Sequence, residues 1–278
     1  MTRRSALLGT CALLLALAGG VAAGEAPALP GWEVLQYEQR GFGITARSQL
    51  TLERDSAEGG VLVLTAESAI ASNSETVALR LDPASYRLRS RTRLSQGRDQ
   101  RFKSWQYGPG QITRERREPG GDQTLPPGEW DLSSRIEVPY PAAAKELPVT
   151  GAYALLPLAS RMLSADSPAL EVIVHTDRNF YRVRMTPGTG PAVAADYRIL
   201  GENRRISGRR DTRSVTLKAT PEGTQRDKPD FSVLGLSGDI TVLFDAGTGI
   251  PLQLRGRAPR IGSATINLQA VAMRESME

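Results

Sequence analysis

Residues 86–94 read Tyr-Arg-Leu-Arg-Ser-Arg-Thr-Arg-Leu, with arginine at every second position. A β-strand directs successive side chains to opposite faces of its sheet. A period of two residues therefore predicts a strand with one charged face and one face toward the core. The charged face of this strand would carry Arg87, Arg89, Arg91 and Arg93. Strands with one buried face are typical of antiparallel sheets.

The same alternation recurs along most of the chain. Leu50 and Leu52 alternate with polar residues, and a second run places Val77, Leu79 and Leu81 on one face. Further candidate strands cover residues 101–107, 111–117, 134–138, 169–176, 180–186, 213–219, 239–245, 250–255 and 263–273. Proline, glycine and aspartate separate these runs, as hairpin turns require. We therefore predict a mainly β fold in which residues 24–278 form one domain, a single curved antiparallel sheet or half-barrel with one short helix.

Residues 119–168 differ from the rest, because they hold 8 of the 18 prolines and show little strand pattern outside 134–138. We interpret them as an excursion within the domain. The one credible helix lies near 157–164, where Leu158, Met162 and Leu163 are apolar. Proline is tolerated only in the first turn of a helix, so this helix should begin near Pro157. We expect it to lie against the concave face of the sheet.

The N-terminal residues 1–23 have the pattern of a cleavable signal peptide. Arg3 and Arg4 precede an apolar run at 6–18, and Val-Ala-Ala at 21–23 provides a small-residue cleavage site. We therefore expect an exported protein, periplasmic or extracellular. No later stretch is both long and uncharged, so no transmembrane segment is expected in the mature chain. The only cysteine, Cys11, lies in the leader, which leaves the mature chain without a disulfide or a thiolate.

Residues for catalysis or metal binding are scarce in this sequence. His175 is the only histidine, and Asp177 could orient it as a general base, although an ordinary sheet histidine is the simpler interpretation. One histidine without cysteine cannot form a usual zinc site. No Gly-x-Ser-x-Gly elbow is present, and no cofactor motif is recognisable. We therefore predict a non-catalytic protein without metal or cofactor.

Three functions remain open at this point. The first is an envelope protein that binds a lipid or another apolar or amphiphilic ligand, with Leu158, Met162 and Leu163 covering the ligand. The second is a module that binds an anionic envelope glycan through arginine forks and stacked aromatic rings. Its residues would be Arg87, Arg89, Arg91, Arg93, Trp105 and Tyr107. The third is a hydrolase with two carboxylates that are far apart in sequence.

Each candidate also has a simpler structural interpretation. The arginine row could be a solvated strand face, the two aromatic residues could pack inside a barrel, and the helix could be ordinary core. The formal net charge of the whole chain is +5, and two arginines of the leader contribute to it. A charge this small does not predict a nucleic acid or another polyanion as partner.

Three segments together resemble a known family. They are Tyr-Glu-Gln-Arg-Gly-Phe-Gly-Ile at 37–44, Gly-Ala-Tyr-Ala-Leu-Leu at 151–156, and Gly-Ile-Pro-Leu-Gln-Leu at 249–254 followed by Gly262 and a long terminal strand. In this order they resemble the secreted bacterial proteins grouped as domain of unknown function 3108. The resemblance implies a periplasmic antiparallel β-fold without an assigned reaction.

The hairpin at 244–252, Phe-Asp-Ala-Gly-Thr-Gly-Ile-Pro-Leu, is also similar to a segment of half-barrel lipoprotein carriers and related lipid-sensing periplasmic domains. That likeness implies a curved sheet around an apolar cavity. No catalytic residue carries over from either group.

Overall fold

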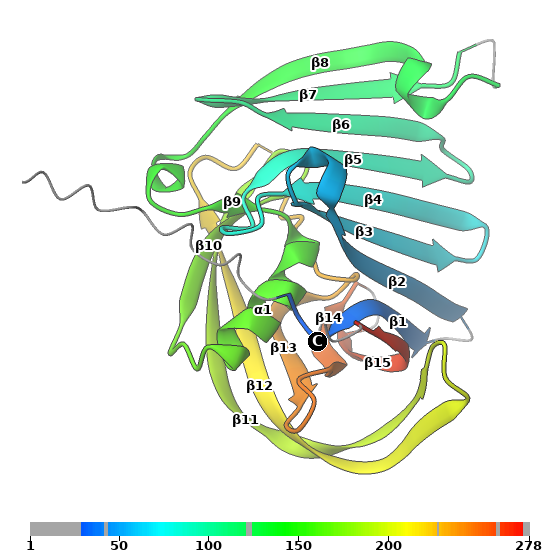
Figure 1. Ribbon diagram of the computed structural model, residues 1–278. Helices are drawn as coiled ribbons and strands as arrows, with labels where there is room; N and C mark the ends of the chain where they lie inside the picture. Colours follow the sequence, from blue (N-terminus) through cyan, green and yellow to red (C-terminus); the bar gives the residue numbers. More distant parts are fainter. Residues whose placement is uncertain (1–28, 42–43, 121–123, 227, 260–261, 275–278) are drawn as a thin grey trace, which may run out of the picture.

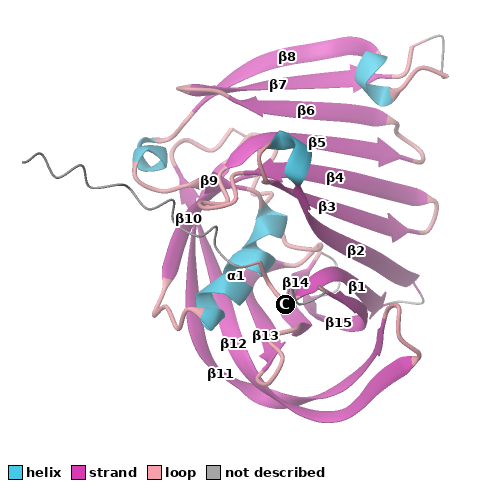
Figure 2. Ribbon diagram, in the orientation of Figure 1, coloured by secondary structure: helices cyan, strands magenta, loops and turns pink. Residues whose placement is uncertain are grey.

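The computed structural model describes residues 29–41, 44–120, 124–226, 228–259 and 262–274. Within these ranges the chain forms one curved sheet of 15 strands and one α-helix (Figures 1 and 2). The predicted mainly β fold with a large curved sheet and one short helix is therefore confirmed. The predicted signal peptide, residues 1–23, lies outside the described residues.

The strands follow the alternating segments of the sequence. In chain order they are β1 (Trp32–Gly41), β2 (Ile44–Asp55), β3 (Val61–Ile70), β4 (Asn73–Leu81), β5 (Leu88–Gln96), β6 (Arg101–Tyr107), β7 (Gln111–Glu118), β8 (Asp131–Pro139), β9 (Val149–Thr150), β10 (Leu170–His175), β11 (Phe180–Ile199), β12 (Arg204–Glu222), β13 (Ser237–Asp245), β14 (Pro251–Ala258) and β15 (Gly262–Met273). Short 3-10 helices are η1 (Ser56–Glu58), η2 (Pro127–Glu129), η3 (Ala142–Lys145) and η4 (Ala152–Ala154).

The sheet has two parts that meet at β1 and β15. Strands β8 to β1 pair in reverse chain order as an open wing, and β15 to β9 continue from β1. Almost all pairings are antiparallel, and the exceptions among the described strands are β9 with β10 and β11 with β15. In the second exception Arg198 lies opposite Ala270 and Ile199 opposite Val271. This short contact closes β11, β12, β13, β14 and β15 into a ring beside the open wing.

The helix α1 (Leu155–Ser164) lies inside the curve of the sheet (Figure 1). Pro157 occupies its first turn, as predicted, and η4 leads into it. The helix is fixed by contacts with both parts of the sheet. Trp32 of β1 donates its indole N–H to Ser160 Oγ at 3.3 Å, and Arg213 of β12 donates to the carbonyl of Leu163 at 3.1 Å. Among the described residues, no helix combines the length and apolarity needed to cross a bilayer.

Two apolar cores result from this arrangement. The larger one surrounds α1 and includes its side chains Leu155, Leu156, Leu158, Ala159, Met162 and Leu163. The smaller one lies between the wing and the start of the second part, because β9, β10 and β11 cover the concave face of β6 to β8. Its buried members are Trp105, Ile112, Val138, Ala144, Val149, Ile173 and Phe180. The end of β10 is therefore packed on both faces.

We expect Leu158→Ala to lower the free energy of unfolding by about 2–5 kcal/mol, because its side chain is only 1% exposed and the truncation leaves a cavity in the larger core. Urea denaturation followed by circular dichroism measures this loss. Leu132→Ala on β8 is the matched control, since Leu132 is 49% exposed and its truncation should change the value by about 0.5 kcal/mol or less. Equal losses in both variants would contradict the assignment of α1 to the core.

Candidate functional site

The arginines of residues 86–94 do not share one face, so that prediction is wrong. Leu81 pairs with Leu88 and Arg80 with Ser90, which places Arg89 in a β-bulge. Because a bulge adds one residue to a strand, the alternation reverses beyond it. A turn between β4 and β5 directly precedes this bulge. In it the Tyr86 N–H donates to the carbonyl of Asp82, and Tyr86 adopts a φ of 56°.

The bulge divides the arginine row between the two faces of the wing. Arg89 is exposed and forms an ion pair with Asp82 at 3.2 Å. Arg91 and Arg93 lie opposite Leu79 and Val77 and so belong to the concave face that the protein buries. Two cations thus lie on the same face as the apolar side chains of Val77 and Leu79.

Neighbouring strands add more basic residues to this concave face. Arg91 of β5 pairs with Trp105 of β6, which pairs with Arg114 of β7. Arg93 pairs with Lys103 in the next row. Trp105 is fully buried, and the guanidinium carbon of Arg91 lies 3.6 Å from the centre of its ring. The indole therefore supports an arginine and is not an exposed platform for a sugar.

The turn after β10 covers this basic surface and supplies its counter-charge. Asp177 accepts hydrogen bonds from Lys103 Nζ at 2.6 Å and from Arg114 Nε at 2.7 Å, and its backbone carbonyl accepts from Trp105 Nε1 at 3.2 Å. Burial opposes the charged form of this carboxyl. The hydrogen bonds and charges of Lys103 and Arg114 outweigh burial and hold the pKa of Asp177 well below its usual range.

His175 is fully buried beside the same turn. Its Nδ1 atom lies 2.9 Å from the Tyr107 hydroxyl, and its ring stacks on Phe180 with the centroids 4.7 Å apart. Burial, followed by the positive charge of Arg91, lowers the pKa of His175 well below its ordinary value, so the imidazole is neutral. Asp177 bonds to Lys103 and Arg114 instead of the imidazole, so the pairing that would orient a general base is not formed.

Arg91 differs from the other cations of this cluster because it has no carboxylate partner. Arg93 pairs with Glu75, and Lys103 and Arg114 share Asp177. Arg91 is 8% exposed, and its Nη1 donates to the backbone carbonyl of His175 at 3.0 Å. Its Nε has no hydrogen-bond partner, and no ion pair involves Arg91 in the described part of the chain. A buried guanidinium without a counter-ion is costly, and such groups are concentrated at functional sites.

Arg91 lines a cavity of about 330 Å³, which we call the Arg91 pocket. Its walls come from β4, β5, η4, the turn after β10 and the segment 230–232, and its polar lining includes Glu75, Arg93, Tyr153, Thr176, Asp177 and Asp230. Gly151 allows η4 to form one wall, because a Cβ there would lie 2.9 Å from Leu79 Cδ1. Burial raises the pKa of Tyr153 to about 12, so this wall presents a neutral phenol.

Asp230 stands on the wall formed by the segment 230–232. Its Oδ1 accepts from the Thr176 hydroxyl at 2.8 Å and from Asn179 Nδ2 and the Tyr181 hydroxyl at 3.1 Å. Its Oδ2 accepts from the Asp177 N–H at 3.3 Å. These four donors are neutral, and no ion pair of Asp230 occurs within the described ranges. The carboxylate is therefore firmly oriented but not neutralised.

The Arg91 pocket continues into an outer groove of about 660 Å³, with which it shares Glu75, Tyr153 and Ser232. This groove follows the outer ends of β2 to β5 and the segment 232–235. Its lining mixes apolar residues such as Ile70 and Leu234 with charged ones such as Arg98 and Arg101. A ligand held in the Arg91 pocket would have room to extend along it.

The other residues predicted for ligand binding are distributed elsewhere. Arg87 and Tyr107 line a separate hollow of about 430 Å³ next to η3, together with Tyr140 and Lys145. The predicted lipid-contacting side chains of α1, Leu158, Met162 and Leu163, are buried in the larger core and do not line the Arg91 pocket. The sequence therefore identified Arg91 and Arg93 as ligand-binding residues. It suggested Asp177 only as a partner of His175 and did not select Asp230 or Tyr153, because the contributions of these three residues depend on tertiary contacts.

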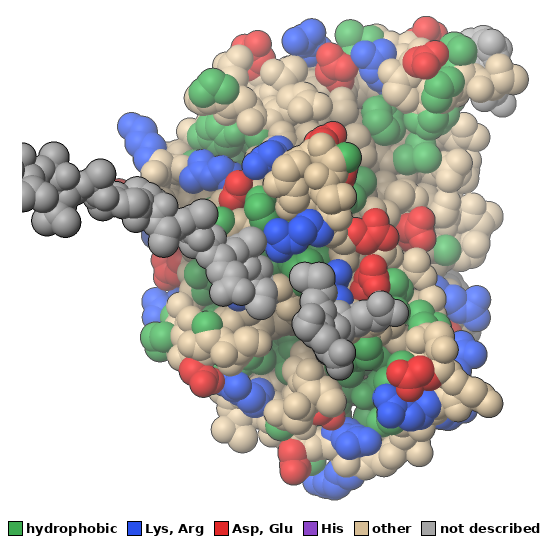
Figure 3. Space-filling model, viewed as in Figure 1, with side chains coloured by type: hydrophobic (Ala, Val, Ile, Leu, Met, Phe, Trp, Pro, Cys, Tyr) green, Lys and Arg blue, Asp and Glu red, His purple; other side chains and the backbone are tan. Residues whose placement is uncertain are grey.

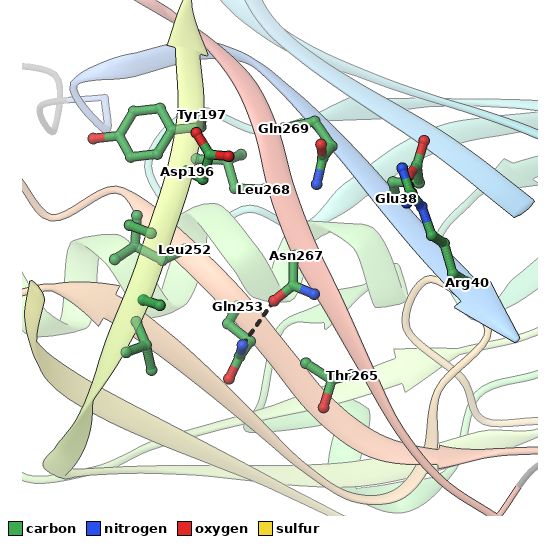
Figure 4. A pocket seen from close by; sticks show the side chains of 13 residues that line it. Glu38, Arg40, Asp196, Tyr197, Leu252, Gln253, Thr265, Asn267, Leu268 and Gln269 are labelled. Carbon is green, nitrogen blue, oxygen red and sulfur yellow. Dashed lines mark hydrogen bonds and ion pairs between the residues drawn. The ribbon is translucent and has the colours of Figure 1, made fainter. Parts of the chain in front are cut away.

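Another hollow, of about 430 Å³, opens where β11 and β14 separate along β15 (Figure 4). Its charged side chains are already paired within the protein, Glu38 with Arg40 and Asp196 with Arg205. Gln253 and Asn267 form a hydrogen bond of 2.7 Å across it. The face in Figure 3 likewise shows basic and acidic side chains interspersed. The Arg91 pocket is therefore the stronger candidate, since it contains a buried charge that the protein leaves unpaired.

No cluster of three or more potential metal-ligating residues occurs in the part of the chain that the structure describes. Comparisons of the chain with known family models, with characterised proteins and with solved structures each find no match. The two resemblances inferred from the sequence therefore stay predictions.

We expect the stability of the protein to fall as the pH drops below about 6.5. His175 is the only histidine, and in the unfolded chain it gains a proton near that pH. The folded imidazole stays neutral, so the unfolded state binds more protons than the folded state. The free energy of unfolding therefore falls by up to about 1.4 kcal/mol for each unit by which the pH is lowered. Urea unfolding between about pH 7 and pH 5 measures this slope. His175→Gln should abolish it, and an unchanged slope would contradict the buried neutral state.

We expect Asp177→Asn to lower the free energy of unfolding at neutral pH by about 2–4 kcal/mol, because Lys103 and Arg114 would lose their shared counter-ion. Asp99→Asn, which removes an exposed ion pair with Arg101, is the control and should cost about 0.5 kcal/mol or less. The folded pKa of Asp177 is lowered, so its contribution is complete above about pH 4 and declines as the pH falls further. If both variants lost the same free energy of unfolding at neutral pH, this assignment would be contradicted.

Proposed function

We propose that the protein is a non-catalytic binding protein for a polar ligand with an anionic group, such as an acidic sugar of the cell envelope. Arg91 would bind the anionic group inside the Arg91 pocket. The observation that carries the proposal is a guanidinium that is 8% exposed, lines a cavity and has no ion pair in the described part of the chain.

The energetics of burial support a ligand at this position. Removing a cation from water without a partner costs several kcal/mol, and an anion placed beside it recovers much of that cost. Arginine suits this role because its planar fork matches the oxygens of carboxylate, phosphate and sulfate groups. Trp105 holds the guanidinium from one side, and the carbonyl of His175 orients Nη1. Arg91 is thus positioned before the ligand arrives.

A lipid ligand receives less support from the same geometry. Burying one methylene contributes about 0.8 kcal/mol, whereas association costs about 4 kcal/mol or more, so an acyl chain needs a deep apolar cavity. The outer groove mixes Ile70 and Leu234 with Arg98 and Arg101 and would leave such a chain in contact with charges. The apolar side chains of α1 are engaged in the core.

A carboxylate-dependent hydrolase also receives less support. Such a reaction needs one carboxyl group that keeps a proton at working pH so that it can act as general acid. Asp177 is a partly buried carboxyl in the pocket lining, but Lys103 and Arg114 keep it ionised. Export to the periplasm, which the expected signal peptide implies, agrees with an envelope glycan as the source of the ligand.

We expect glucuronate and glucose 6-phosphate to bind the wild-type protein in isothermal titration calorimetry, and neutral glucose to bind at least tenfold more weakly. Arg91→Met should remove the preference for the acidic sugars. Its melting temperature should stay equal or rise, since replacing a buried unpaired charge by an apolar side chain is not destabilising.

Arg89→Met is the matched control, because Arg89 is exposed and does not line the Arg91 pocket. It should bind as the wild type does. Equal affinity for glucose and glucuronate, or unchanged selectivity in Arg91→Met, would refute the proposal.

A further inference from the structure

Every charged side chain that lines the Arg91 pocket has an ion-pair partner among the described residues, except two. Glu75 pairs with Arg93, and Asp177 pairs with Lys103 and Arg114. Among the described residues, Arg91 and Asp230 have no ion pair, either with each other or with a third group. One pocket therefore contains one buried cation and one exposed carboxylate, each without an ion pair in the described part of the chain. A purely anionic ligand would satisfy only the first.

Both unpaired groups are held by the same short piece of backbone. Arg91 Nη1 donates to the carbonyl of His175, and Asp230 Oδ2 accepts from the N–H of Asp177. These backbone groups are two residues apart, so they are separated by at most about 7 Å. The guanidinium and the carboxylate are thus both anchored to one turn, and no ion pair joins them among the described residues. A small group that carries both charges would find a partner of opposite charge for each of them at this turn.

The carboxylate of Asp230 has spare capacity to accept a hydrogen bond from a cationic donor. Its Oδ1 already accepts three hydrogen bonds, whereas Oδ2 accepts one from Asp177 at 3.3 Å. An ionised carboxylate oxygen can accept two hydrogen bonds, so Oδ2 retains acceptor capacity. The four neutral donors fix its orientation without cancelling its charge. This combination suits a ligand ammonium, which provides both the donor hydrogens and the counter-charge.

We propose that the ligand of the Arg91 pocket is zwitterionic, with its anionic group on Arg91 and a primary ammonium on Asp230. This inference rests on the proposed function and narrows its ligand class. An amino sugar phosphate and a free α-amino acid share this chemistry, and both are compatible with a cavity of about 330 Å³.

Calorimetry with matched ligand pairs tests the inference without any variant. Glucosamine 6-phosphate is compared with N-acetylglucosamine 6-phosphate, and alanine with N-acetylalanine. Acetylation removes the ammonium and retains the anionic group, so we expect it to weaken binding by about tenfold or more in at least one pair. The pair with the larger loss identifies whether the source is an amino sugar or an amino acid.

Asp230→Asn should abolish the preference for the free amine and leave the affinity for glucose 6-phosphate nearly unchanged. Asp196→Asn is the control, because Asp196 lines the separate hollow of Figure 4 and should leave the preference intact. If glucose 6-phosphate binds but neither pair favours the amine, the zwitterion is wrong and the proposed function stands. If none of these anions binds, both proposals fall.

Discussion

The carboxylate of Asp177 is the group on which the architecture around the pocket depends. It bonds to Lys103 and Arg114, which precede it in the chain by 74 and 63 residues, and so joins the turn after β10 to the open wing. Two cations on a concave face would otherwise be buried without a counter-ion, which is strongly unfavourable. Because they share this counter-ion, the face can be covered and Trp105 becomes fully buried. The position of Arg91 against that indole follows from the same closure.

Much of the fold could be predicted because its signal is local. The alternation of Leu50 and Leu52 with polar residues indicates a half-buried strand wherever that strand pairs, and Pro157 marks the first turn of a helix in any context. The bulge at Arg89 was not predictable in this way. It depends on the turn that precedes β5 and on the register with β4, neither of which alters the pattern of residues 86–94. The contact of β11 with β15 likewise joins segments that have no local relation.

The candidate site shows the same limit. Arg91 and Arg93 could be identified from the sequence because a row of arginines on a strand is unusual, whereas Asp230 is one aspartate in a loop. Its importance arises from hydrogen bonds to Thr176, Asn179 and Tyr181, residues about fifty positions earlier. Trp105 illustrates the reverse case, since the sequence allowed either a sugar platform or a buried ring and only its neighbours distinguish the two.

The seam between β1 and β15 has a consequence for the order in which the sheet is completed. From β1 to β8 each strand pairs with its predecessor in the chain, so the wing can assemble hairpin by hairpin as synthesis proceeds. The outer edge of β1 has no partner until β15, the last strand, has been made. Until then the first strand presents an unpaired row of N–H and C=O groups, the kind of edge that promotes aggregation. A chain interrupted before residue 262 would keep that edge permanently, so the sheet itself distinguishes chains that contain β15 from chains that lack it.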